Sequence, residues 1–423
     1  MRSYQTLELS INDAQPQIMH IDLNSCFATV EQQARPLLRG RPVAVTNRLT
    51  RNACVIACSY EAKAQGVKVG MGLQEAKLLA PDIVSLESDP PKYHFAYKQL
   101  VKIMRSYSPN VVMKSIDEGI INFEGTRLIN TGQLADIGYE IKQRLKDRVG
   151  NWMKCNIGIA PNRFLAKQAA SLHKPDGLDI IDHTNLRSTL ASLELTDLTG
   201  IAARNEARLN ASGIMTPLQF LDAPAELLRK RVFKSVCGDD WYKRLRGYEV
   251  DDYESATNTI GRQFVLDEMH PTDESVRARL ASLCEGTGLK LRHKGLSARG
   301  ISVHVGYKSG DAWHERRAFK SSFYTSDEIY RRATLLFNKR PRDDYERILA
   351  VTCYLLEPSI RNQASLLEEV EREHWLTTAV DSINEHFGNY TVTFASSLAA
   401  KGQIKQKIPF GSTRYFELLI DKA

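Results

Sequence analysis

Apolar positions in the first part of the chain switch between the spacing of a strand and that of a helix. The run IMHID at residues 18–22 predicts a short strand, and the chain passes into a helix near Ser25. The pattern at residues 111–125 predicts a hairpin. Further strands and helices are expected at residues 41–84, a helix at 93–107, a helix at 132–148, a strand at 154–160 and a helix at 162–173.

The second half of the chain has a different pattern. Residues 184–247 are short and helical, with two brief helices around a glycine turn, and the polar residues 249–261 predict a linker. Two amphipathic helices then alternate with strands, one from Asp273 to His293 and one that starts at Thr325. We therefore expect an α+β protein of several domains, with a β-α-β-β-α-β domain near its C-terminus.

The expected hairpin carries two adjacent carboxylates, Asp117 and Glu118, within an otherwise apolar stretch. An ionised carboxylate without a partner is costly in such surroundings. A third carboxylate, Asp22, ends the first strand, and beside the hairpin bend it would bring three negative charges together. Mutual repulsion disfavours that cluster unless a cation joins it, and Mg²⁺ prefers such oxygen ligands. From the pair alone, however, a solvated turn is the more common reading.

Length and composition limit the class of protein. A chain of 423 residues is too long for one core and predicts about three or four domains. No apolar run is long enough to span a membrane, and the polar N-terminus lacks the core of a signal peptide. Seven scattered cysteines then indicate reduced thiols, so we expect a cytoplasmic location and no membrane partner.

The net charge of +7 is compatible with a polyanionic partner but does not prove one. The excess is concentrated in residues 259–361, which hold 18 Lys and Arg against 13 Asp and Glu. Basic residues in this segment are the expected binding surface for nucleic acid phosphates.

Four motifs resemble those of the Y-family DNA polymerases, the lesion-bypass enzymes that include bacterial DNA polymerase IV and the catalytic subunit of DNA polymerase V. HIDLNSCFATVEQ and SIDEG are similar to the two metal motifs, CVIACSYEAKAQGVKVGM to the fingers motif, and GIAPNRFLAKQAASLHKPDGL to the segment that closes the palm. The resemblance implies a right-hand architecture. Its parts are palm (1–29 and 85–182), fingers (30–84), thumb (183–250), linker (251–261), little finger (262–360) and C-terminal tail (361–423).

The resemblance also implies roles for individual residues. Asp22, Asp117 and Glu118, with the backbone carbonyl of Leu23, would bind two Mg²⁺ ions for transfer of a deoxynucleotide to a primer 3′-hydroxyl. Phe27 would be a steric gate against ribonucleotides, although it would otherwise read as a core residue on a helix face. The residues that match the family's triphosphate-binding positions are Tyr60, Lys63 and Lys174.

The chain departs from many family members at three positions. Asn24 stands where many polymerase IV members have Asp, and Ala57 lacks a hydroxyl that some members use on the triphosphate. Ala202 replaces the second glycine of the thumb's helix-hairpin-helix, which puts one close approach to a DNA phosphate in doubt. The subtype, polymerase IV-like or polymerase V-like, stays open.

The peptide QASLL at residues 363–367 resembles the short motif by which bacterial polymerases bind the sliding clamp. Gln363 would enter a polar site, and Leu366 and Leu367 would fill an apolar pocket. The alternative is that these residues are only the first turn of a helix. The tail beyond them resembles polymerase V subunits, which implies an accessory protein of the SOS response or a recombinase as partner.

Three functions compete. The first is a low-fidelity, template-directed DNA polymerase that uses primer-template DNA and deoxynucleoside triphosphates. The second is a catalytically silent relative that binds DNA and clamp as a scaffold, and the third is a nucleotidyl cyclase with a similar palm. Retention of all three carboxylates favours an enzyme over the scaffold, and the thumb-like and little-finger-like segments disfavour the cyclase.

Overall fold

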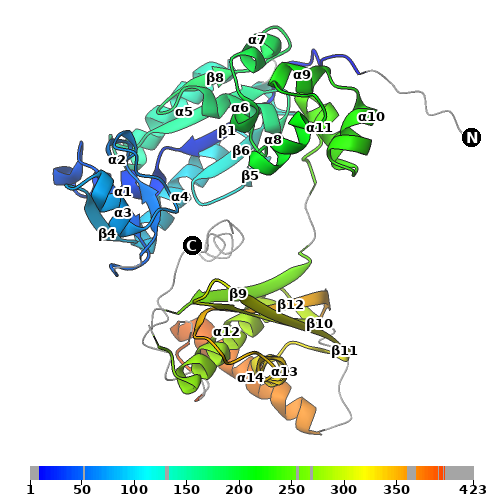
Figure 1. Cartoon of the computed structure of the whole chain (residues 1–423). Coiled ribbons are helices and arrows are strands. Elements are labelled where there is room, and N and C mark those ends of the chain that lie inside the picture. The colour runs from blue at the N-terminus through cyan, green and yellow to red at the C-terminus, as the bar shows by residue number, and fades with distance from the viewer. Residues whose placement is uncertain are drawn as a thin grey trace, which may run out of the picture. The chain divides into compact units, whose positions relative to one another are not determined.

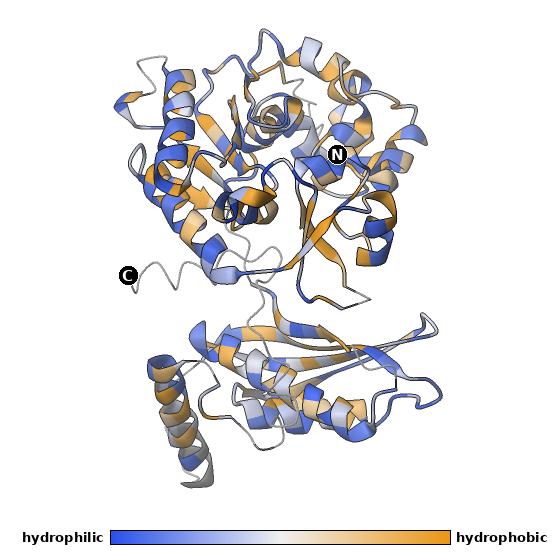
Figure 2. Ribbon diagram, turned by 90° about the vertical axis from the view of Figure 1, so that its left-hand side faces the viewer, coloured by the Kyte–Doolittle hydropathy of each residue, from blue (hydrophilic) through white to orange (hydrophobic). Residues whose placement is uncertain are grey.

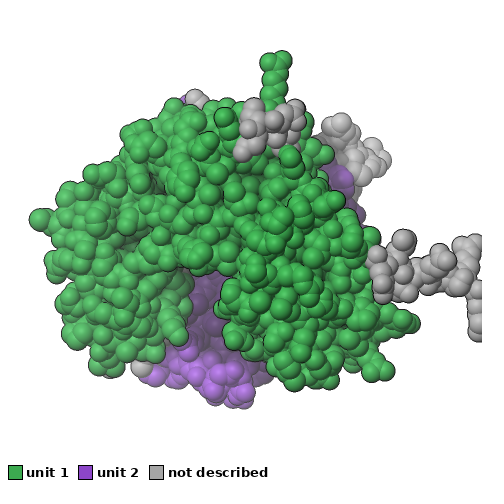
Figure 3. All heavy atoms as spheres, turned by 90° about the horizontal axis from the view of Figure 1, so that it is seen from above, with its two compact units in different colours: residues 1–253, 407–423 green, residues 254–406 purple. Residues whose placement is uncertain are grey.

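The chain divides into two compact units in a computed structural model, which describes residues 9–50, 53–128, 133–253, 257–266, 270–359, 368–388, 390–393 and 395. The described part of the first unit ends at Tyr253, and the second unit begins at Glu254 (Figure 3). This boundary falls inside the polar segment from which the linker is predicted. No helix in these ranges is long and apolar enough to cross a membrane.

A five-stranded sheet in the order β5-β6-β1-β7-β8 forms the centre of the first unit (Figure 1). The middle strand β1 pairs antiparallel with both of its neighbours, β6 and β7. Both flanking strands therefore hold the backbone of β1 along its length. The strands are β1 (Ile18–Leu23), β5 (Val111–Met113), β6 (Glu118–Asn122), β7 (Cys155–Ala160) and β8 (Leu178–Ile180).

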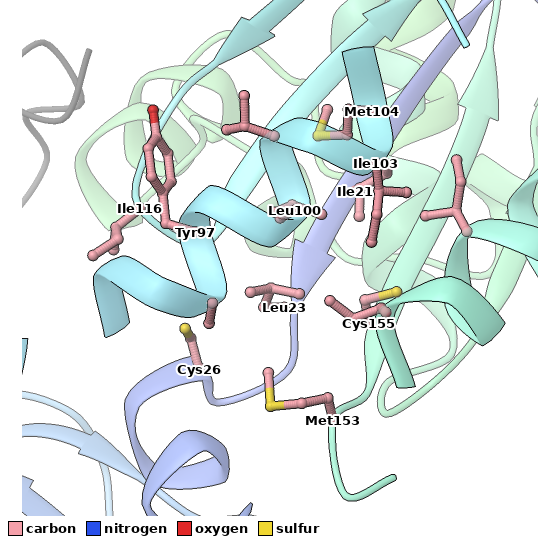
Figure 4. Close-up of a cluster of buried hydrophobic side chains, with 14 of the residues drawn as sticks. Ile21, Leu23, Cys26, Tyr97, Leu100, Ile103, Met104, Ile116, Met153 and Cys155 are labelled. Carbon is pink, nitrogen blue, oxygen red and sulfur yellow. The ribbon is translucent and has the colours of Figure 1, made fainter. Parts of the chain in front are cut away.

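The two faces of this sheet bury different side chains, because successive residues of a strand point to opposite sides. Ile21 and Leu23 of β1 pack in one apolar cluster with α4 (Pro90–Arg105) and α5 (Leu134–Val149), part of which Figure 4 shows. The opposite face packs against α6 (Arg163–Leu172). Figure 2 shows mostly apolar residues in the central strands and alternating apolar and polar residues in the surrounding helices.

Gly158 on β7 allows α6 to lie unusually close to the sheet. A Cβ atom at this position would be 2.0 Å from the carbonyl oxygen of Ala166 and 2.2 Å from the backbone nitrogen of Ala170. Both are backbone atoms of α6, which cannot give way as a flexible side chain would.

We therefore predict that Gly158→Ala lowers the free energy of unfolding by about 3 kcal/mol, since overpacking a core forces backbone shifts. Urea denaturation followed by circular dichroism measures this change. Gly72→Ala is the matched control, because a Cβ atom there has no neighbour within 4 Å. Equal stabilities of the two variants would contradict the predicted close packing.

A smaller lobe lies beside this sheet. Its sheet has the order β3-β2-β4, with β2 paired antiparallel to β3 and parallel to β4. Helix α1 follows β1 directly and connects the central sheet with this lobe. The elements are α1 (Cys26–Ala34), a 3₁₀ turn (Pro36–Leu38), β2 (Val43–Thr46), β3 (Val55–Cys58), α2 (Tyr60–Ala64), α3 (Leu73–Leu79) and β4 (Val84–Glu87).

The remainder of the first unit is helical, as the helical spacing of apolar residues in this segment predicts. These helices and the smaller lobe lie on two sides of the unit: Figure 3 shows a notch in its surface between the side of α1–α3 and the side of α9–α11 in Figure 1. The elements are α7 (Leu186–Ala191), a 3₁₀ turn (Leu195–Asp197), α8 (Ala203–Asn210), α9 (Pro217–Asp222), α10 (Ala225–Leu227), the π-helical turn η4 (Leu228–Val232) and α11 (Cys237–Leu245).

The second unit follows the predicted β-α-β-β-α-β order. Its sheet has the order β11-β10-β12-β9, and α12 and α13 share an apolar core with the sheet. A long helix, α14, continues beyond this pattern (Figure 1). The elements are β9 (Thr259–Val265), α12 (Asp273–His293), β10 (Leu296–Tyr307), β11 (Ala312–Phe323), α13 (Ser326–Phe337), β12 (Glu346–Pro358) and α14 (Glu368–Phe387).

Candidate active site

Asp22 and Glu118 lie opposite each other on neighbouring strands of the central sheet. Their Cα atoms are register partners between β1 and β6, and Asp22 is also paired with Asn156 on β7. Opposed residues of adjacent strands project from the same face of a sheet. The two carboxylates therefore share the face that packs against α6.

Asp117 is the last residue of the turn before β6, so the pair of carboxylates lies at a hairpin as the sequence predicts. The backbone N–H of Leu23 donates to the carbonyl oxygen of Asp117 at 2.8 Å, which ties the turn to the end of β1. Burial raises the pKa of the Asp117 carboxyl, and a hydrogen bond from Ser115 opposes this shift. The charges of Asp22 and Glu118 raise this pKa further, so all three carboxylates are electrostatically coupled.

Glu118 has two cationic or potentially cationic partners on the α6 face. The ammonium group of Lys167 donates to its two oxygens at 2.9 and 3.1 Å, and Nε2 of His20 lies 3.4 Å from Oε2. Burial by itself would raise the pKa of Glu118, but hydrogen bonds and charge from His20 and Lys167 lower it to about 2. This carboxylate is therefore ionised at neutral pH.

Lys174, in the loop after α6, forms an ion pair with Asp22. Tyr60, the first residue of α2, lies in the same region: burial and the negative charge of Asp22 raise the pKa of its phenol to about 12. The ammonium group of Lys63 lies 4.6 Å from the centre of the Tyr60 ring. The structure thus brings the three residues predicted to bind a triphosphate close to one of the predicted metal ligands.

Phe27 projects from α1 into the apolar cluster of the first unit and is 9% exposed. Its ring stacks on that of Tyr93, with centroids 4.3 Å apart and planes 12° from parallel. The Tyr93 hydroxyl donates to the fully buried Glu31 at 3.0 Å. Phe27 therefore has a packing role, and its role in sugar selection stays a prediction.

Sequence reasoning missed two residues of this site, His20 and Lys167. Both residues could have been noticed, because His20 is two residues before Asp22 on the same strand face and Lys167 lies in the run GIAPNRFLAKQAASLHKPDGL. The sequence did not show the register of β1 against β6 or the packing of α6, which together bring Glu118 within reach of both side chains. The predicted clamp residues Gln363, Leu366 and Leu367 lie outside the described residues.

The carboxylates are held by lysine, histidine and serine side chains rather than gathered as a preformed metal cage. Within the described ranges, no group of three or more His, Cys, Asp or Glu side chains is arranged to hold a metal ion. The donor set nevertheless fits a hard divalent cation, since it offers carboxylate oxygens. Burial is the main cause of the raised pKa of Asp117, and the neighbouring charges of Asp22 and Glu118 add to it.

The ion pair between Lys167 and Glu118 predicts a specific pH dependence. A carboxyl group whose pKa is lowered on folding stabilises the protein above its ordinary pKa of 4.5, and that contribution is lost as the pH falls toward 2. At pH 6 and with a chelator present, Lys167→Met should lower the free energy of unfolding by about 0.5 kcal/mol. The expected loss is small because Lys167 is partly exposed, and water weakens exposed ion pairs.

Urea titrations at pH 6 and pH 3.5 measure this effect. The difference between parent and Lys167→Met should shrink at the lower pH, where Glu118 becomes protonated in the unfolded chain. Lys114→Met, at an exposed lysine of the same hairpin, controls for loss of one positive charge. A difference that grows as the pH falls would contradict the assigned pair.

Comparisons with known proteins match most of the chain. The impB/mucB/samB family matches residues 21–171, and the C-terminal domain of that family matches residues 257–366. DNA polymerase IV of Moorella thermoacetica is 32% identical over 395 residues, which cover 91% of this chain and 97% of that protein. DNA polymerase IV of Pelotomaculum thermopropionicum is 30% identical over 398 residues, covering 92% and 97%.

A solved chimera of the Y-family DNA polymerases Dbh and Dpo4 has the same fold, with a TM-score of 0.70 and 23% identity over 80% of this chain and 98% of the chimera. The chain belongs to the Y family of DNA polymerases. The resemblance read from the four motifs is thereby confirmed, as is the α+β fold class. This Y-family member is a DNA-directed DNA polymerase of translesion synthesis and DNA repair.

Proposed function

We propose that this polymerase adds deoxynucleotides to a primer 3′-hydroxyl at Asp22, Asp117 and Glu118. The observation that carries the proposal is the pairing of Asp22 with Glu118 across β1 and β6, beside the turn that holds Asp117. These three carboxylates, with the carbonyl of Leu23, would hold two Mg²⁺ ions. When bound, the ions would activate the 3′-hydroxyl and stabilise the leaving pyrophosphate in an in-line displacement.

The surrounding residues support binding of a deoxynucleoside triphosphate. Lys63 and Lys174 offer ammonium donors and Tyr60 a hydroxyl donor that the raised pKa keeps protonated, and such donors suit a triphosphate. Lys174 would exchange its partner from the Asp22 carboxylate to a phosphate oxygen. The flat ring of Phe27 would lie against the sugar and exclude a 2′-hydroxyl.

The domain assignment follows the same proposal. The central sheet would be the palm, the lobe of α1–α3 and β2–β4 the fingers, and α7–α11 the thumb. The second unit would be a little finger whose basic residues hold DNA phosphates. Low fidelity on damaged templates is part of this proposal, by analogy with the family.

Primer extension on a defined template with added Mg²⁺ tests the proposed function. The parent protein should extend the primer one templated nucleotide at a time and release pyrophosphate. A catalytically silent scaffold would bind the same primer-template without extending it, and a cyclase would convert a nucleoside triphosphate without any primer. Either of these results would reject the proposal.

We also propose that residues 363–367 bind a sliding clamp. Replacing Gln363, Leu366 and Leu367 together with Ala should reduce clamp-stimulated synthesis about tenfold or more, since the apolar anchors of a short peptide carry most of its affinity. Synthesis without clamp should be unchanged, because the peptide is far in sequence from the carboxylates. An accessory protein or recombinase of the SOS response is a further proposed partner.

A pull-down with purified clamp provides the second measurement. Ser359→Ala, just before the peptide, is a control that leaves its three anchors intact. Equal clamp capture by the parent and the triple variant would exclude this peptide as the binding element.

A further inference from the structure

Two buried asparagines form a bridge beneath the loop that carries Lys174. Asn24 follows β1 and is 3% exposed, and Asn156 on β7 is fully buried. The Nδ2 group of Asn24 donates to Oδ1 of Asn156 at 2.9 Å. The bridge therefore joins the end of β1 to the neighbouring strand, directly beside the carboxylates.

Both ends of the bridge are attached to the backbone of the same loop. The Oδ1 atom of Asn24 accepts from the N–H of Asp176 at 2.8 Å, and Nδ2 of Asn156 donates to the carbonyl of His173 at 3.0 Å. Lys174 lies between these two residues in the sequence. A backbone N–H can only donate and a carbonyl can only accept, so the loop fixes the orientation of both amides.

The loop is also held from its other side. The buried Lys142 of α5 donates to the carbonyl of Asp176 at 2.5 Å and to its carboxylate at 3.1 Å. A Cβ atom at Gly177 would be 2.1 Å from the carbonyl oxygen of His173, so the chain turns tightly here. The backbone on both sides of Lys174 is thus fixed, while its side chain reaches Asp22.

Asn24 also lies near Tyr60, and its side chain has a minor lowering effect on the pKa of that phenol, which burial and Asp22 raise. Its own backbone is fixed as well, with its N–H donating to the carbonyl of Lys154 at 2.9 Å. The side chain of Asn24 thereby joins the end of β1 to the neighbouring strand β7 and to the Lys174 loop.

We propose that Asn24 and Asn156 are positioning residues that set the affinity for the incoming nucleotide by holding the Lys174 loop. Neither side chain needs to touch the substrate: both act through Lys174, whose ammonium group must reach the triphosphate from a fixed backbone. This proposal rests on the proposed function, in which Lys174 binds that triphosphate. The proposal also explains the neutral amide at residue 24, because the carboxylate of an Asp there could not donate a hydrogen bond to Oδ1 of Asn156.

Isosteric changes test the bridge because each breaks it at a known atom. In Asn24→Asp, a carboxylate oxygen would face the Oδ1 atom of Asn156, and in Asn156→Asp it would face the carbonyl of His173. The neutral variants Asn24→Leu and Asn156→Leu remove the same hydrogen bonds without adding charge. All four should raise KM for the deoxynucleotide about tenfold, the usual effect of leaving a buried polar group unpaired, and should change kcat much less.

The measurement is steady-state single-nucleotide insertion, with primer-template affinity and thermal unfolding measured in parallel. Asn151→Asp, at an exposed asparagine, is the control for an added negative charge. If the two charged variants raise KM and the two neutral ones do not, the effect is electrostatic and the bridge has no positioning role. Unchanged KM in all four, at unchanged folding, would also overturn the proposal.

A double-mutant cycle with Lys174→Ala separates positioning from general damage. If Asn24 and Asn156 act through Lys174, adding Asn156→Leu to Lys174→Ala should raise KM little further, whereas independent effects would multiply. Multiplying effects would refute the inference while the polymerase activity of the parent stands. Failure of the parent to extend a primer would instead refute the proposed function itself.

Discussion

Asp117→Ala and Glu118→Ala are each expected to abolish nucleotide insertion while the protein still binds primer-template DNA. Loss of one metal-ligating carboxylate removes several kcal/mol of transition-state stabilisation, which corresponds to a rate reduced by roughly 10³-fold or more. Affinity for DNA rests on phosphate contacts elsewhere and should change by less than about threefold. Single-turnover insertion and fluorescence anisotropy measure the two quantities.

Glu124→Ala is the matched control for this experiment. Glu124 is an exposed carboxylate a few residues beyond Glu118, and its side chain makes a long contact of 3.4 Å with Asn122. It should insert nucleotides at the parent's rate. Wild-type rates in Asp117→Ala or Glu118→Ala would show that chemistry takes place at another site.

Phe27→Ala is expected to cause a large rise in ribonucleotide insertion, with deoxynucleotide insertion reduced much less. Phe27 is the second residue of α1, five residues beyond Asp22, and we expect a 2′-hydroxyl of a nucleotide bound there to press on its ring and lose its water partners. We expect the ratio of kcat/KM for deoxynucleotide over ribonucleotide to fall by roughly 100-fold, equivalent to a few kcal/mol.

The stacking of Phe27 on Tyr93 complicates the alanine variant, because removing a buried aromatic ring costs about 3–5 kcal/mol of stability. Phe27→Leu fills more of that space and should give an intermediate ratio, and Phe27→Tyr should preserve the wall. Thermal unfolding establishes that each variant is folded at the assay temperature. A ratio unchanged in both Phe27→Ala and Phe27→Leu would mean that Phe27 serves packing alone.

Much of the fold follows from local patterns in the sequence. The run at residues 18–22 becomes β1, and the helix expected from Asp273 to His293 has those bounds. The helix expected to start at Thr325 is α13, and the side chain of Thr325 caps it. These elements are readable because apolar periodicity and capping are local properties of the chain. The hairpin with Asp117 and Glu118 was predicted for the same reason.

The partners of the carboxylates were not predictable in this way. Lys167 is 49 residues from Glu118 in sequence, and the two meet only because α6 packs closely against β7 at Gly158. Asn24 and Asn156 are likewise 132 residues apart and are brought together by the pairing of β1 with β7. Such contacts depend on strand register and helix packing, which a single sequence does not specify.

The central position of β1 has a consequence for how the site is lost. Amide groups of β1 are bonded to β6 on one side and to β7 on the other, so a fluctuation that releases Asp22 must open two ladders together. Local opening of a protein involves cooperative segments, and those in the middle of a sheet open only at a free energy near that of global unfolding. Asp22 therefore belongs to the last segment to open, and mild denaturing conditions would loosen the lobes and loops around the site before they displaced this carboxylate.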